Sequence, residues 1–142
     1  APYIRARYAY FGGDRGGSAR VESFDPFFYG FSDWGTWYLG DMTSYSLTNT
    51  NARVAALEFG ASPVEQVKLR LLLYDFTLER KMPFSSSRAW SREANLVVDW
   101  FPAEWLFLGT MVGAALPGQA AEDFNGSDET QTEWMGWVGL TF

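Results

Sequence analysis

The sequence predicts an all-β fold, an antiparallel sheet whose strands cross a membrane as part of a β-barrel. The stretch TEWMGWVGLTF, residues 132–142, alternates, so that one side of an extended strand carries Trp134, Gly136, Val138, Leu140 and Phe142. Successive side chains of a strand point to opposite faces, which makes this face almost wholly apolar. Aromatic residues form 18% of the chain, and no apolar run is long enough for a membrane helix.

Composition narrows the classes of function. The 142 residues predict one domain, residues 1–142. Without cysteine and histidine there is neither a thiolate metal site nor the commonest general base, so we expect no enzyme, no catalytic residue, no cofactor and no metal site. A net charge of −6 argues against nucleic acid as a partner.

Tryptophan and tyrosine suit a membrane–water boundary, because one end of each ring is apolar and the other polar. With a helical span excluded, only a closed β-barrel satisfies every backbone polar group within a bilayer. The alternative interpretation of the alternating segments is a set of half-buried strands in a soluble sheet.

Six strands are expected, at 2–12, 52–61, 67–79, 93–101, 105–116 and 132–142. Their connections are alternately long and short. The short ones are proline turns at 62–66 and 102–104, whereas 13–51, 80–92 and the acidic loop 117–130 are long. Outer-membrane barrels show this asymmetry, with tight periplasmic turns and extended outer loops, so we expect a periplasmic carboxy terminus.

The connection 13–51 is rich in aromatic residues as well as in Pro, Gly, Asp and Asn. Because loops of this length in compact domains are usually functional, we expect a long aromatic outer loop there, with 24–45 as a docking surface for a protein partner. Under the alternative interpretation, 27–31 and 37–47 are two more strands.

Alternation also predicts which charges face away from the apolar side. These charges would line a water-filled lumen or substrate path, and they are Arg5, Arg7, Glu58, Lys68, Arg70, Glu93 and Asp99. Arginine holds carboxylates through paired hydrogen bonds, and rings of charge set pore selectivity. The alternative is that these charges only pair with one another. Asp75 falls on the apolar side, so by that point we expect the strand to have left the hydrocarbon or to carry a bulge.

Three segments resemble the carboxy-terminal part of alginate-export-type outer-membrane porins. They are YIRARYAYFGGDR, SFDPFFYGFSDWGTWYLGDM and REANLVVDWFPAEWLFLGTMVGAALPGQA. In that family a later strand carries the pattern E-x-(D/N)-L-x-x-x-(W/Y), matched here by Glu93, Asn95, Leu96 and Trp100, and a Pro-Gly pair follows the next strand, matched by Pro117 and Gly118.

The resemblance implies an eighteen-stranded barrel in the outer membrane of a Gram-negative bacterium, passing anionic polysaccharide or small anionic solutes by passive diffusion. The spacing of Trp134, Val138, Leu140 and Phe142 also resembles the terminal strand that the barrel-insertion machinery reads. The expected partners are therefore outer-membrane lipid, that machinery and an anionic polysaccharide.

Six strands are too few for a bilayer-spanning barrel, since the smallest single-chain barrels have eight. The chain would then be part of a longer polypeptide, a subunit sharing a wall, or a barrel whose aromatic loop supplies two strands. Two functions follow: an outer-membrane porin or a segment of one, and alternatively a non-conducting barrel that serves as an anchor or sheath for a partner complex.

Overall fold

The structure is a computed structural model that describes residues 1–14, 23 and 50–141. Its strands are β1 (Tyr3–Phe11), β2 (Ala52–Val64), β3 (Val67–Leu78), β4 (Ala89–Ala103), β5 (Leu106–Pro117) and β6 (Gln131–Leu140), with one helix, α2 (Gln119–Asn125). The all-β antiparallel fold is thus confirmed. The segments 27–31 and 37–47, the docking loop 24–45 and Phe142 lie outside the described residues.

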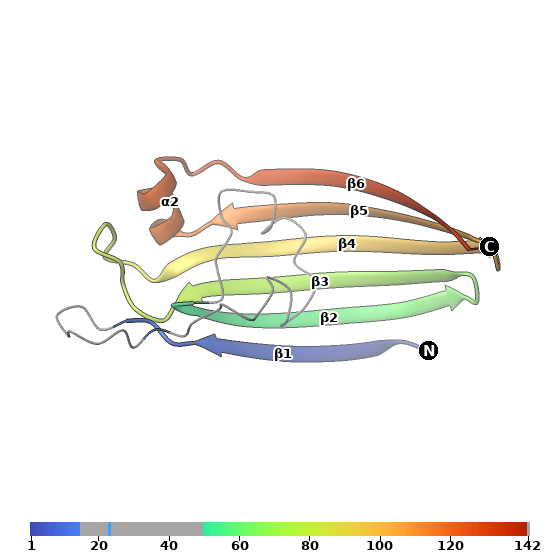
Figure 1. Cartoon of the computed structure of the whole chain (residues 1–142), viewed down its shortest axis with the longest axis horizontal. Helices are drawn as coiled ribbons and strands as arrows, with labels where there is room; N and C mark the ends of the chain where they lie inside the picture. Colours follow the sequence, from blue (N-terminus) through green and yellow to red (C-terminus); the bar gives the residue numbers. More distant parts are fainter. Residues whose placement is uncertain (15–22, 24–49, 142) are drawn as a thin grey trace.

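The six strands form one sheet in chain order, each antiparallel to its neighbours. Within the described part of the chain the sheet is open, with β1 and β6 as its two edges. Figure 1 shows a long sheet with the β2–β3 and β4–β5 turns at one end, and with α2 and the β3–β4 connection at the other. We call these the short-turn end and the long-connection end.

β2 and β4 extend several residues beyond their predicted bounds because pairing with a neighbour continues. β2 reaches Val64, so the turn shrinks to Glu65–Gln66, after an irregularity in the β2–β3 ladder between Ala61 and Val64. β4 begins at Ala89 rather than Glu93 because Ala89 pairs with Thr77.

Trp90 is the extra residue of a bulge near the start of β4. Phe76 pairs with Ser91 and Thr77 pairs with Ala89, which leaves Trp90 opposite neither. Trp90 and Ser91 are consequently both buried, against the alternation of the rest of β4. The ladder is regular at Asp75, and the extra residue of the nearby irregularity lies on β4, so β3 does not carry the bulge considered for it.

The acidic loop contains a short helix that the sequence analysis did not predict. α2 follows Gly118 and ends at Gly126, whose left-handed backbone (φ 71°) suits glycine and whose N–H donates to the carbonyl of Glu122. Ala120 and Ala121 are fully buried in the main apolar cluster. The helix thus closes the core at the long-connection end of β4 and β5.

Candidate functional site

Cross-strand register places all seven predicted lumen residues on one side of the sheet. In the strand register, Arg5 lies opposite Glu58 and Lys68 lies opposite Asp99. Arg70 and Glu93 point to the same side of the sheet as these residues. We call this side the charged face. It is also where the apolar cluster gathers, including Leu72, Val97 and Met111. The sequence therefore predicted the sidedness of these residues correctly, and their role as a lumen stays a prediction.

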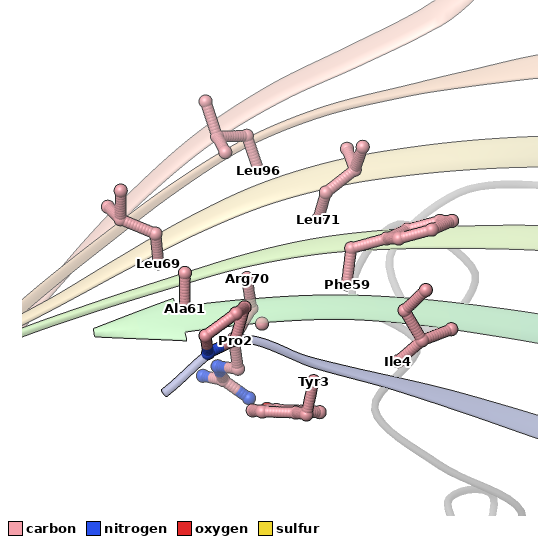
Figure 2. A pocket seen from close by; sticks show the side chains of 10 residues that line it. Pro2, Tyr3, Ile4, Phe59, Ala61, Leu69, Arg70, Leu71 and Leu96 are labelled. Carbon is pink, nitrogen blue, oxygen red and sulfur yellow. The ribbon is translucent and has the colours of Figure 1, made fainter. Parts of the chain in front are cut away.

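The opposite side, the apolar face, is exposed. Ile4 and Trp134, on the two edge strands, are 72% and 74% exposed, and Leu96 in the middle of the sheet is 51% exposed. Figure 2 shows Phe59, Leu69, Leu71 and Leu96 projecting to this side around an open groove, while Arg70 and Tyr3 project to the other. The sheet thus exposes its apolar face, while polar residues and an apolar cluster are buried together on its charged face.

At the β1 edge of the charged face, Glu58 accepts from two residues. Arg5 Nη1 lies 3.1 Å from Glu58 Oε2, and the Tyr3 hydroxyl donates to Glu58 Oε1. Tyr3 reaches it because Gly60, its partner in the ladder, has no side chain, so the ring lies against the Gly60 backbone. Arg5 itself remains 61% exposed.

A second ion pair joins β3 and β4. Arg70 Nη2 lies 2.9 Å from Asp99 Oδ2, and both side chains are largely buried. Lys68, on the same row as Asp99, is exposed and places its Nζ 5.0 Å from the ring centre of Phe101. The alternative left open by the sequence, that these charges pair with one another, therefore holds for Arg5 with Glu58 and for Arg70 with Asp99.

The most deeply buried polar group of the charged face lies in β4. Glu93 is 3% exposed and Asn95 is fully buried. Asn95 Nδ2 donates to Glu93 Oε1, whereas Asn95 Oδ1 has no hydrogen-bond partner among the described residues. A buried carbonyl without a partner costs free energy, so Glu93 and Asn95 are the least favourably satisfied polar pair on this face.

Three residues of this face were absent from the predicted set. Tyr3 and Asn95 are the ones that bond to Glu58 and Glu93, and Glu133 on β6 lies on the same side, opposite Gly113. Alternation already placed all three on the charged side. Only the register, which the sequence does not supply, shows that Tyr3 and Glu58 meet.

The predicted insertion-signal residues lie along β6. Trp134, Val138 and Leu140 share the apolar face and are all more than half exposed. On the other side of β6, the Trp137 indole lies against Gly109 of β5, in the space that a side chain at Gly109 would fill.

The long-connection end has its own polar contacts. Arg53 forms an ion pair with Glu79, and the Arg53 guanidinium lies 5.5 Å from the centre of the Tyr10 ring. Hydrogen bonding from Arg53 lowers the pKa of Glu79 below its usual value, with a smaller contribution from Tyr10. Nearby, hydrogen bonds from Ser85 and then Gln119 lower the pKa of Asp123 in α2.

Comparison with protein-family models, with curated proteins and with solved structures gives no match to this chain. In the described part of the chain, no helix has the length and apolar character needed to cross a membrane. The same residues contain no group of three or more acidic side chains placed to hold a metal ion.

Proposed function

We propose that the chain is part of the wall of an outer-membrane β-barrel porin, which passes anionic polysaccharide or small anionic solutes by passive diffusion. The observation that carries this proposal is the exposed apolar face. A lipid-facing wall needs such a surface, with its polar residues turned the other way.

The length of the apolar face supports the proposal. On β4 it runs from Ala94 to Trp100, bounded by the charged Arg92 at the long-connection end. At ~3.3 Å per residue, the six steps from Ala94 to Trp100 span about 20 Å, and the eight steps from Arg92, the first charge on that side, span about 26 Å before strand tilt shortens the height. Lipid-facing bands of membrane barrels are about 25 Å tall and end in aromatic residues. Trp100 and Trp105 are exposed at the short-turn end, and Tyr8 and Tyr10 lie toward the other.

The accessibility of charge on the charged face supports the anionic preference. Arg5, Arg7 and Lys68 are exposed, whereas Glu93 and Asp99 are buried and Glu58 and Glu133 are half-buried. An anion moving along this face would meet cations more readily than carboxylates. The cations lie on β1 and β3, while Glu93, Asp99 and Glu133 lie on β4 and β6. This arrangement would produce a field across a bore.

The test is ion selectivity in planar bilayers. The quadruple variant Arg5→Ala, Arg7→Ala, Lys68→Ala, Arg70→Ala is expected to lose most of the wild-type preference for anions, measured as the reversal potential in a salt gradient. Unchanged selectivity in this variant would contradict the role in anion selectivity assigned to these four residues.

A charge-conserving control separates the effect of positive charge from the effect of guanidinium geometry. The variant Arg5→Lys, Arg7→Lys, Arg70→Lys is expected to keep the preference for small anions. It should bind a polyuronate less tightly, because lysine lacks the planar fork that holds a carboxylate.

One observation favours the alternative function, a non-conducting barrel that anchors or sheathes a partner complex. Asn95, Val97 and Met111, in the middle of the charged face, are fully buried, whereas a water-filled bore would expose them. Insertion without conductance, together with a crosslink from 24–45 to another protein, would favour this function over the porin.

A further inference from the structure

Five cations gather at the long-connection end of β2, β3 and β4. This cluster, the basic rim, consists of Arg53, Arg80, Lys81, Arg88 and Arg92. The acids that contact these strands or the β3–β4 connection are Asp75, Glu79 and Asp123, the last of which bonds to Ser85. Four further described acids, Asp14, Glu122, Asp128 and Glu129, lie at the same end after β1 and between β5 and β6, so the basic rim is a local cluster of cations rather than a net positive end.

The basic rim directly borders the apolar face. Arg53 and Arg92 lie on the apolar side of β2 and β4, one place beyond Ala55 and Ala94 in the alternation. From the rim toward the short-turn end, the exposed side chains of that face are apolar, as at Leu57 and Leu96. Along the strands, an apolar surface is thus followed directly by cations. A lipid leaflet has the same sequence of layers, with acyl chains followed by headgroup phosphates. The long apolar stems of arginine suit such a boundary.

The cations of the rim retain hydrogen-bonding capacity. Arg92 is 81% exposed and donates through Nε to Asp75, at 3.0 Å. Arg88, also exposed, donates through Nη1 to the carbonyl of Glu79 at 3.3 Å, and Lys81 is exposed. A guanidinium has five N–H donors, so one bond leaves most of them for a phosphate.

The rim is also held in place. The Asn51 side chain bonds to both the backbone N–H and the backbone carbonyl of Arg80, and Arg80 Nε donates to the carbonyl of Gly13. The start of the β3–β4 connection is therefore fixed to the ends of β1 and β2. Such preorganisation reduces the entropy lost on binding a ligand.

The opposite end of the sheet has no comparable cluster of cations among its described residues. Its two turns carry Glu65 and Glu104, both exposed. Of the described residues near those turns, Lys68 is the cation, and it lies on the charged face over Phe101. The exposed cations that border the apolar face thus gather at the long-connection end of β2, β3 and β4, where they could meet an anionic headgroup layer.

We infer that the basic rim binds the phosphates of anionic lipid headgroups at the boundary of the bilayer. The inference rests on the membrane placement in the proposed function and adds a lipid class to it.

The test measures which lipids surround the inserted protein. The whole chain is reconstituted into phosphatidylcholine vesicles containing a trace of dansyl-labelled phosphatidylglycerol or dansyl-labelled phosphatidylcholine, and energy transfer from tryptophan is recorded. Wild type is expected to enrich the anionic lipid, and the enrichment should fall as salt is added. In the variant Lys81→Gln, Arg88→Gln, Arg92→Gln, we expect it to drop at least about fivefold, because each cation near an anionic surface contributes to binding.

A charge-matched control removes three cations from the charged face. The variant Arg5→Gln, Arg7→Gln, Lys68→Gln is expected to keep the wild-type enrichment. If both triple variants lost the same amount of anionic-lipid enrichment, the enrichment would depend only on net charge. That result would overturn the inference. Displacement of the labelled lipid by millimolar inorganic phosphate would also overturn it, since it would show a site for the free ion.

Failure of this inference is distinguishable from failure of the proposed function. If wild type inserts but transfers energy equally to both labelled lipids, the rim does not select anionic lipid. The proposed role of the sheet as a membrane wall is then unaffected. If wild type does not enter vesicles at all, both proposals fail. The comparison of the two lipids uses wild type alone, so it does not depend on whether the variants fold.

Discussion

Asn51 and Arg80 form a reciprocal pair: the Asn51 carbonyl oxygen accepts from the Arg80 N–H at 2.8 Å, and its amide donates to the Arg80 carbonyl at 3.2 Å. The backbone of Asn51 also donates to Gly12 and accepts from Glu79. One residue therefore ties together the end of β1, the start of β2 and the end of β3. Asn51 has a left-handed backbone (φ 51°), which asparagine tolerates better than most residues.

Replacing Asn51 should separate the contributions of its side chain and its backbone. Asn51→Gly keeps the left-handed conformation and loses the two bonds to Arg80 and the weaker one to the Met82 sulfur, at a cost of about 2 kcal/mol. Asn51→Ala loses the same bonds and adds about 1 kcal/mol or more of left-handed strain. The measurement is urea unfolding in detergent micelles, followed by tryptophan fluorescence. Equal stability of the alanine variant and wild type would contradict the role assigned to Asn51.

The same substitution at two glycines should have opposite effects. A Cβ at Gly109 would collide with the Trp137 indole, so Gly109→Ala should displace that ring and cost about 1–3 kcal/mol. At Gly136 the nearest atom to a new Cβ would be 3.8 Å away, so Gly136→Ala should be neutral or slightly stabilising. Unfolding midpoints and the tryptophan emission maximum report both outcomes. A neutral Gly109→Ala would show that Trp137 does not depend on this space.

The ion pair of Glu79 with Arg53 should make stability depend on acidity. Arg53 holds the pKa of Glu79 below its ordinary value of 4.5. The pair therefore stabilises the fold above about pH 4.5, and this contribution is lost as the pH falls through the depressed value. Removing the carboxylate with Glu79→Gln should remove this part of the acid dependence.

The measurement compares urea midpoints of wild type and Glu79→Gln between neutral pH and about pH 3. The difference between the two proteins should shrink as the pH is lowered. Glu65→Gln in the exposed β2–β3 turn is the matched control, because Glu65 makes no ion pair with the described residues. A pH-independent difference at Glu79 would contradict the titration.

The strands were predictable where alternation is strong. Val67 to Leu73 alternate apolar residues with a mixed set, and β3 runs through this segment as expected. The bounds of β4 were missed because Ala89 to Arg92 read as a polar loop. They join the strand because β3 offers a partner, and the bulge at Trp90 adjusts the register. Such pairing depends on the neighbouring strand rather than on the local sequence.

The helix α2 was missed for a different reason. Its seven residues are too few to show a clear helical period, and Glu122 and Asp123 made the segment read as an acidic loop. Its apolar contribution is only Ala120 and Ala121, which pack in the core cluster. Helices this short are stabilised by packing rather than by propensity.

For the candidate site, alternation predicted which residues share a face but not which ones meet. Glu58 lies opposite Arg5 only because β1 and β2 pair across a connection of about forty residues, whose length does not set the register. Asn95 was part of the family resemblance, and its buried contact with Glu93 depends on the packing of β4.

The opposite directions of β1 and β6 have a consequence for ring closure. In an all-antiparallel cylinder, every strand must run against both of its neighbours. Because the two edges of this sheet already run against each other, any cylinder that contains it is completed by an even number of additional strands. An odd-stranded cylinder would require a parallel pair at one of the remaining seams.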